Sequence, residues 1–378
     1  MTQAPAQRID FLVVAGEISG DLYAGLLVKH LKQITPSTRV WAVGGDALKQ
    51  ESDYFIAETV YDHAVGLAGV LKTMFTSPRW LNQLKHVLKT TRFKRVIVVD
   101  FQHYNTIIAA LCLSHGIAVD TVITPNFWIW NDIKNAKKIA TYSERIFTIF
   151  EPEYHLYQGL HPRVYYFGHP MVELVEPLSH PLPHPHRVTF FPGSRMQEMK
   201  LMVRPMVEIA RHVHQAYPQA ELVFNVSSAY FKTYIATEIK RYPDVPIQLW
   251  KGSKADLLNQ TSVLVCASGS ATLEGILYHV PMLMLAALPP ITYFLAKHIM
   301  RLKLPYVTLP NLIASGHVVP EWVQNNIRPK DIATSVVSLI KDPEKAQNLL
   351  KAYGPIEASL KKSPRPFAEI AQVLLKSL

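Results

Sequence analysis

Short apolar runs alternate with stretches of helical periodicity along almost the whole chain. The first apolar run, 9–15, has the length of a buried strand, and the apolar positions of 22–33 recur at helical spacing. In the first half the pattern predicts strands at 9–15, 39–43, 95–100, 119–124, 145–149 and 164–167, and helices at 22–33, 79–91, 104–115 and 151–158. Such alternation is typical of parallel α/β sheets.

The same alternation returns in the second half. It predicts strands at 187–191, 220–225, 246–249, 262–266 and 281–286, helices at 197–216, 229–241, 269–278 and 291–301, and a helical tail at 329–378. Residues 176–186 hold four prolines, which block a helix and a central strand. The histidines of this segment, His180, His184 and His186, are poorly spaced for a shared metal site. We therefore expect two α/β domains facing each other across a cleft and joined by a Pro-rich linker.

Composition and charge narrow the class of protein. A chain of 378 residues with 49% hydrophobic and 18% charged residues suits two globular domains. Cys112 and Cys266 lie in apolar runs without metal-binding spacing, which indicates buried thiols in a reducing compartment. The apolar start is too short for a signal peptide, and prolines interrupt the uncharged stretch 275–296. We expect a cytoplasmic protein.

The net charge of +10 fits an anionic partner. No nucleic-acid module or basic tail is visible, so we expect no nucleic-acid partner. The basic residues recur in small groups, each alone typical of a solvated face: Lys85, Lys89, Arg92, Lys94 and Arg95; Lys134, Lys137 and Lys138; Lys297, Arg301 and Lys303. Together they favour attraction to an anionic membrane surface.

The turn after the first strand carries candidate chemistry. Glu17, Ser19 and Asp21 follow Gly16 at the carboxyl end of a predicted strand, where open α/β sheets bind ligands. The turn lacks the glycine spacing of dinucleotide folds and the Lys-Ser/Thr of a P-loop, which disfavours nicotinamide and ATP. An alternative interpretation is that Glu17 and Asp21 only cap the following helix.

Two turns of the second half suit a nucleotide diphosphate. The backbone amides of Gly193 and Ser194 would converge with Arg195 on a phosphate, unless Arg195 pairs only with a local carboxylate. A second turn places Ser268, Gly269 and Ser270 before a helix, with Glu274 a turn further on and able to accept both ribose hydroxyls. Its alternative is a Ser-rich N-cap. The two turns together favour a nucleotide sugar.

An ordered set of motifs resembles the lipid-A-disaccharide synthase family of inverting GT-B glycosyltransferases. The motifs are Ala-Gly-Glu-Ile-Ser-Gly-Asp at 15–21, Val-Gly-Gly at 43–45, Asp100 with Asn105, Trp-Ile-Trp at 128–130, Phe-Gly-His-Pro-Met at 167–171, Pro-Gly-Ser-Arg at 192–195, Ser-Gly-Ser-Ala-Thr-Leu-Glu at 268–274 and Tyr-Val-Thr-Leu-Pro-Asn-Leu at 306–312. The resemblance implies a UDP-2,3-diacylglucosamine donor, a 2,3-diacylglucosamine 1-phosphate acceptor, and the β-1,6-linked disaccharide 1-phosphate and UDP as products. The resemblance further implies a place in lipid A biosynthesis, in the cytoplasm and peripherally associated with the inner membrane.

The resemblance also implies which part of the chain binds each substrate. Residues 1–175 would bind the acceptor, 176–186 would be the linker, 187–345 would bind the UDP-sugar, and the helices of 346–378 would cross back to the first domain. A homodimer is one assembly that the resemblance leaves open. Asp100 is expected to be the catalytic base or its orienter, with Glu17 as the rival. No Asp-x-Asp metal motif is present, so neither a metal nor a cofactor is expected.

Further residues take their expected roles from the matched motifs. The UDP-binding set is Gly193, Ser194, Arg195, Ser268, Gly269, Ser270, Glu274 and Asn311, and the acceptor or cleft set is Ser19, Asp21, Asn105, Trp128, Trp130 and His169. Segments 65–71, 74–75 and 289–295 are candidates for acyl-chain contact, or simply pack a core.

The departures from the family pattern all fall in the first domain. After Asp100 the family's x-Pro-Asp-Phe-Asn is replaced by Phe-Gln-His-Tyr-Asn at 101–105, Gly69 stands where an acid is common, and 124–126 is Thr-Pro-Asn instead of Ser-Pro-Ser. His103 could take over proton handling or be an ordinary surface histidine. Three alternatives therefore stay open: a GT-B relative with another acceptor, a UDP-sugar epimerase, and a non-catalytic UDP-sugar or lipid-binding paralogue.

Overall fold

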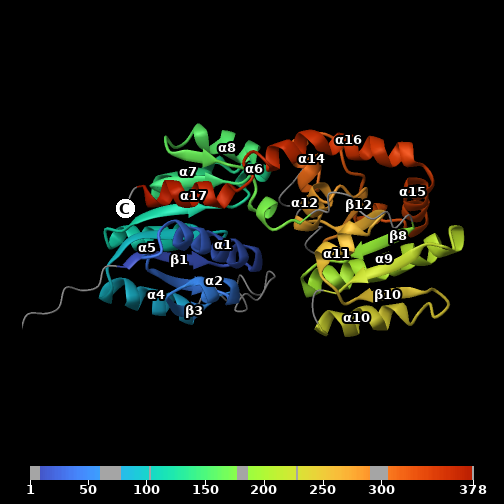
Figure 1. Ribbon diagram of the computed structural model, residues 1–378, viewed down its shortest axis with the longest axis horizontal. Coiled ribbons are helices and arrows are strands. Elements are labelled where there is room, and N and C mark those ends of the chain that lie inside the picture. The colour runs from blue at the N-terminus through green and yellow to red at the C-terminus, as the bar shows by residue number, and fades with distance from the viewer. Residues whose placement is uncertain are drawn as a thin grey trace, which may run out of the picture. The chain divides into compact units, whose positions relative to one another are not determined.

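The computed structural model describes residues 9–59, 78–101, 104–176, 186–226, 229–289 and 305–376. The chain forms two compact units (Figure 1). The first is Met1–Glu173 with Leu360–Leu378, and the second is Leu174–Ser359.

The first unit is built on a parallel sheet. Seven of its described strands lie in the order β3-β2-β1-β4-β5-β6-β7. Their bounds are β1 (Ile9–Ala15), β2 (Val40–Gly44), β3 (Tyr54–Glu58), β4 (Phe93–Val99), β5 (Ala118–Val122), β6 (Arg145–Thr148) and β7 (Val164–Tyr166). The central strands β1 and β4 are buried along almost their whole length, because helices cover both faces of a parallel sheet.

The first unit also holds helices, most of which connect these strands. They are α1 (Ile18–Ile34), α2 (Asp46–Glu51), α4 (Arg79–Thr90), α5 (Asn105–Ser114), α6 (Phe127–Trp130), α7 (Ile133–Tyr142), α8 (Glu151–Gln158), the 3₁₀ turn η1 (Pro170–Glu173) and, from the end of the chain, α17 (Pro366–Leu375). Helix α17 packs on α1, where Tyr23 and Phe367 meet edge to face at 6.0 Å. In Figure 1 the red α17 lies among the blue and green elements of this unit.

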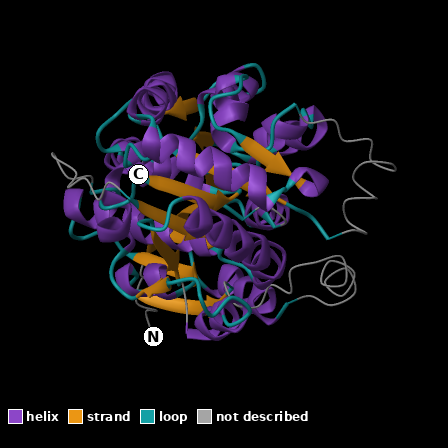
Figure 2. Cartoon of the chain, turned by 90° about the vertical axis from the view of Figure 1, so that its right-hand side faces the viewer, coloured by secondary structure: helices purple, strands orange, loops and turns teal. Residues whose placement is uncertain are grey.

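The second unit holds another parallel sheet, of order β10-β9-β8-β11-β12-β13. Its strands are β8 (Arg187–Phe191), β9 (Glu221–Asn225), β10 (Ile247–Trp250), β11 (Val263–Ala267), β12 (Met282–Ala286) and β13 (Glu321–Val323). Its helices are α9 (Met196–Ala216), α10 (Ala229–Ile239), α11 (Lys254–Asn259), α12 (Ser270–Leu277), α14 (Leu309–Ala314), η3 (Gln324–Asn326), α15 (Pro329–Lys341) and α16 (Pro343–Leu360). Figure 2 shows the strands between purple helices.

The predicted strands all form, with ends shifted by at most two residues. The prediction missed the edge strands β3 and β13. It also missed the helices α2, α6, α7, α11 and α14, most of which are too short to show helical periodicity. It also placed the return of the chain to the first domain at 346, whereas α16 belongs to the second unit up to Ser359. The buried Tyr353 explains this, because its hydroxyl accepts a 3.1 Å hydrogen bond from Met282 N. Residues 177–185 of the expected linker and the expected helix 291–301 lie outside the described residues.

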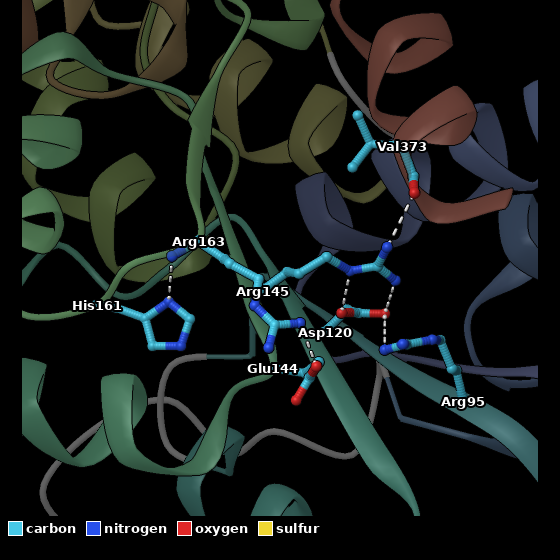
Figure 3. A network of polar contacts seen from close by, with 7 residues as sticks. All are labelled: Arg95, Asp120, Glu144, Arg145, His161, Arg163 and Val373. Atoms are coloured by element: carbon cyan, nitrogen blue, oxygen red, sulfur yellow. Dashed lines mark hydrogen bonds and ion pairs between the residues drawn. The ribbon is translucent and has the colours of Figure 1, made fainter. Parts of the chain in front are cut away.

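A buried ionic network ties α17 to the sheet of the first unit (Figure 3). Arg145, at the start of β6, donates from Nε and Nη2 to the two carboxylate oxygens of Asp120, at 2.7 and 2.6 Å. Its Nη1 donates to the carbonyl of Val373 in α17 at 2.9 Å, and Arg95 approaches Asp120 at 3.5 Å from the other side. Asp120 therefore balances two arginines, and Arg145 links β5, β6 and the C-terminal helix.

Candidate functional site

The polar residues of the first unit gather where parallel strands end. Val99 of β4 pairs with Val122 of β5, and Val122 pairs with Phe147 of β6. Asp100, Thr124 and Glu153 follow these three strands in turn, and Ser19 follows β1 on the other side of β4. The carboxyl edge of this sheet is where ligands of open α/β folds bind.

Asp100 and Ser19 lie in contact at this edge. The Ser19 hydroxyl donates to Asp100 Oδ2 at 3.0 Å, and Asp100 N donates to the Val122 carbonyl at 3.1 Å. Asp100 has φ of 41°, in the left-handed region that non-glycine residues seldom adopt. Gly20 permits the close approach, because a Cβ there would lie 3.0 Å from Asp100 Cβ. The structure thus brings together two predicted site residues, and backbone strain of this kind concentrates at functional sites.

Glu17 and Asp21 have different surroundings. Glu17 is the N-cap residue of α1 but makes no side-chain capping bond, and it stays on the same turn as Ser19. Asp21 is buried and accepts hydrogen bonds from Gly45 N at 2.6 Å, Ala47 N at 2.9 Å and Leu48 N at 3.2 Å. Instead of facing a sugar hydroxyl, Asp21 caps a helix, and that helix is α2 rather than its own α1.

His169 is a packing residue. Its ring lies 5.9 Å from that of Tyr23 and 5.2 Å from that of Phe150, and its Nδ1 accepts from Met171 N at 3.1 Å. Burial lowers the pKa of His169 to about 3, so the ring is neutral at physiological pH. The expected acceptor contact through His169 is therefore replaced by a structural role.

Asn105 and Trp128 carry buried polar atoms without a hydrogen-bond partner among the described residues. Asn105 begins α5 and is 2% exposed, and both polar atoms of its amide lack a partner in the described part of the chain. The buried Nε1 of Trp128 is likewise unpartnered there, while Trp130 is exposed. Buried polar atoms are nearly always satisfied, so these atoms fit the expected acceptor side.

In the second unit, the turn at 193–195 holds an anionic oxygen. Ser194 N and Arg195 N donate to Glu198 Oε2 at 2.9 and 3.3 Å, and Arg195 Nη1 lies 3.5 Å from Glu198 Oε1. Gly193 has φ of 113°, and a Cβ there would meet Glu198 Oε2 at 2.5 Å. The alternative of a local carboxylate partner for Arg195 is thus realised, and the same amides show the turn's capacity for an anion. The Arg195 side chain remains 55% exposed.

The turn at 268–270 leads into α12, with Gly269 at φ of 135° as its N-cap residue. Glu274, further along α12, pairs with Lys254 at 2.5 Å through Oε1, while its buried Oε2 has no partner among the described residues. Lys254 is the first residue of α11. The sequence pattern did not predict its contact with Glu274. Only the pairing of strands brings it beside Glu274, so no local pattern could have found it.

Asn311 is fully buried and has its side chain engaged. Its Oδ1 accepts from Val318 N and Val319 N, at 2.8 and 2.7 Å, and its Nδ2 donates to the Val319 carbonyl at 2.8 Å. The Glu321 carboxylate accepts a further bond from Nδ2 at 3.2 Å. Asn311 therefore orders the loop before β13 instead of reaching a nucleotide.

Comparison with known families matches residues 11–372 to the family described as lipid-A-disaccharide synthetase. The chain belongs to this family. It is accordingly a glycosyltransferase of lipid A biosynthesis, which confirms the resemblance seen in its motifs.

Curated relatives agree with membership of the lipid-A-disaccharide synthetase family. A lipid-A-disaccharide synthase of Anaeromyxobacter dehalogenans is 27% identical, with 99% of both chains covered. One of Dechloromonas aromatica is 30% identical, over 93% of this chain and 94% of its own.

Solved structures establish the fold. A UDP-GlcNAc 2-epimerase of Neisseria meningitidis bound to UDP-GlcNAc has a TM-score of 0.63 at 12% identity, covering 98% and 99% of the two chains. Acinetobacter baumannii MurG has a TM-score of 0.57 at 12% identity, covering 97% and 99%. Both confirm the predicted GT-B class. Among the described residues, no helix combines the length and apolar sequence that a membrane span needs.

Proposed function

We propose that this family member transfers 2,3-diacylglucosamine from its UDP-linked donor to 2,3-diacylglucosamine 1-phosphate, with inversion, forming the β-1,6-linked disaccharide 1-phosphate. The observation that carries the proposal is the Ser19–Asp100 pair at the carboxyl edge of the first sheet. It joins residues of two of the family's motifs, 81 positions apart in sequence, at one edge of the sheet.

The acceptor side of the proposed reaction belongs to the first unit. Asp100 acts as general base and takes the proton of the acceptor 6-hydroxyl, whose oxygen then attacks the anomeric carbon while the bond to UDP breaks. Ser19 orients the Asp100 carboxylate through its hydrogen bond. Asn105 and Trp128 offer their unpartnered polar atoms to the acceptor. Glu17 remains the rival base.

The donor side of the proposed reaction belongs to the second unit. The amides at 193–195 and 268–270 and the Arg195 guanidinium stabilise the growing charge of the leaving UDP, without a metal. In the structure, Ser194 N and Arg195 N both donate hydrogen bonds to the Glu198 carboxylate. In the proposed complex, a diphosphate oxygen displaces this carboxylate and accepts the two hydrogen bonds. The UDP-GlcNAc in the related N. meningitidis structure supports UDP-sugar binding by this fold. Glu274 remains the proposed ribose partner, with Lys254 holding its position.

Substitution of Arg195 by alanine is expected to weaken UDP binding and to lower turnover by about 10²-fold, because a charge-assisted contact to phosphate is lost. Binding is measured by titration calorimetry with UDP. Arg204→Ala is the matched control, since Arg204 lies on the same helix with an exposed side chain paired to Glu208. Equal UDP affinity in the Arg195→Ala variant and the wild type would contradict the phosphate role.

We further propose that the protein associates with the inner membrane surface through its basic groups, such as Lys85 and Lys89 on α4 and Lys134, Lys137 and Lys138 on α7. The acyl-chain candidates 65–71 and 74–75, and the basic group Lys297, Arg301 and Lys303, lie outside the described residues, as does all but the first residue of 289–295. A homodimer remains a proposal from the resemblance.

The deciding experiment supplies both lipid substrates and measures the release of UDP and the formation of the disaccharide. We expect UDP and disaccharide in equal amounts, and neither product without acceptor. Conversion of the UDP-sugar in the absence of acceptor would indicate an epimerase, and disaccharide formed with another acceptor would indicate a different specificity. UDP binding by the folded protein without turnover would indicate a non-catalytic paralogue.

A further inference from the structure

Exposed apolar side chains gather where the strands of the first sheet end. Ile18 and Leu22 lie in the first turns of α1, which follows β1, and Ile107 lies in the first turn of α5, which follows β4. Trp130 ends α6 and Ile133 begins α7, and both follow β5. Since β1, β4 and β5 are consecutive neighbours in the sheet, these exposed residues border the same edge as the proposed base.

The outward face of α1 changes character along the helix. Ile18 is 65% exposed and Leu22 is 47% exposed, and their spacing of four residues places them on one face. Further along the same face the helix carries Lys29 and Gln33, which are exposed and polar. The exposed residues of this face are therefore apolar beside the strand end and polar away from it.

Ile18 and Leu22 flank the hydroxyl group that contacts the proposed base. Ser19 follows Ile18 directly and precedes Leu22 by three residues, so its side chain lies on the neighbouring strip of the helix surface. The Ser19 hydroxyl donates to Asp100 Oδ2 at 3.0 Å. A substrate whose own hydroxyl lies at Asp100 is therefore bordered by this apolar pair.

An apolar cluster around a polar reacting group fits an amphipathic ligand. Exposed apolar residues that are scattered singly need no explanation, whereas a group of them at a ligand-binding edge indicates apolar contact with the ligand. The proposed acceptor has this chemistry, since its sugar hydroxyls are polar and its two acyl chains are apolar. Contact with an acyl chain removes the side chains of Ile18 and Leu22 from water, which stabilises the complex without a further hydrogen bond.

We propose that the exposed apolar residues at this edge hold the acyl chains of the acceptor, with Ile18 and Leu22 as the main contacts. The inference rests on the proposed function, and it adds residues that determine specificity for an acylated acceptor. It assigns this edge to the acyl chains of the substrate, whereas the membrane surface is proposed to meet the basic groups of α4 and α7.

The double variant Ile18→Ser and Leu22→Ser tests the contact in turnover. With one donor throughout, kcat/KM for an acceptor with long acyl chains is expected to fall about tenfold to 100-fold, chiefly through KM, because two apolar contacts are lost. For an acceptor with acetyl groups in place of the long chains, kcat/KM is expected to stay within about twofold. An equal loss with both acceptors would overturn the inference.

Ile34→Ser is the matched control for the double variant. Ile34 is 45% exposed and is the last residue of α1, so it lies about 24 Å along the helix from Ile18. Its substitution removes a similar apolar surface from the same helix and is expected to leave kcat/KM unchanged for both acceptors. A loss equal to that of the double variant would show that the position beside Asp100 has no importance, and would overturn the inference.

Methyl NMR measures the contact without turnover. In protein with ¹³C-labelled isoleucine and leucine methyl groups, the signals absent from the serine variants identify Ile18, Leu22 and Ile34. Addition of the long-chain acceptor is expected to shift the signals of Ile18 and Leu22 and to leave that of Ile34 in place. Unmoved signals, or equal shifts with phospholipid vesicles that lack acceptor, would overturn the inference. A wild type that forms no disaccharide while the acceptor shifts the two signals would overturn the proposed function and support the acyl-chain contact.

Discussion

Asp100→Asn is expected to lower turnover by about 10²–10⁴-fold, the usual contribution of a general base. The amide cannot take a proton from the acceptor hydroxyl, but it keeps the size of the side chain and can still accept the hydrogen bond of Ser19. Because Asp100 belongs to the first unit and the turns proposed to bind phosphate belong to the second, the affinity for UDP should not change. Turnover with both lipid substrates and calorimetry with UDP measure the two effects.

Ser19→Ala and Glu17→Gln complete this test. Loss of the Ser19 hydroxyl should lower turnover by about tenfold, because Asp100 keeps its charge and loses only an orienting hydrogen bond. Glu17→Gln should have a smaller effect than Asp100→Asn. A larger loss in Glu17→Gln would transfer the role of base to Glu17, and unchanged turnover in Asp100→Asn would remove Asp100 from the chemistry.

Asp120→Ala is expected to cost the first unit about 3–5 kcal/mol of unfolding free energy, as the loss of one partner from a buried ion pair does. The substitution leaves Arg145, buried and donating to Asp120 through two nitrogens, with an uncompensated charge. It also loosens the bond between Arg145 and the Val373 carbonyl, so α17 should lose protection together with β5 and β6. Urea unfolding and hydrogen exchange at the amides of α17 provide the measurements.

The matched control for this substitution lies in the same view (Figure 3). Glu144 pairs with Arg163 on the surface, where both side chains are partly exposed. Glu144→Ala should therefore cost at most about 1 kcal/mol and leave the exchange of α17 unchanged. A similar loss of unfolding free energy in Glu144→Ala and Asp120→Ala would contradict the expectation that the buried Asp120 network stabilises the unit more than the exposed ion pair does.

Much of the site could be predicted because it depends on local pattern. A buried strand followed by a glycine-containing turn and a helix is visible in sequence, and this pattern located the turns at 16–21, 193–195 and 268–270. Asp100 was placed at a strand end for the same reason. The assignments that changed, those of Asp21, His169 and Asn311, depend on partners that no local pattern names. Each of the three is buried in the structure, and its side chain accepts a hydrogen bond from a backbone amide of its own unit.

The sequence by itself determined the alternation of strands and helices, the positions of the turns between them and the family, because each depends on contiguous residues. Only the tertiary structure placed Thr124 on Glu153, Lys254 beside Glu274 and α17 against α1. The physical reason is the order of strands in each sheet. Parallel neighbouring strands are joined by long crossovers, so side chains 20 to 230 residues apart in sequence can come into contact. Hydrophobic periodicity shows which residues are buried, but it does not show which residues pack against them.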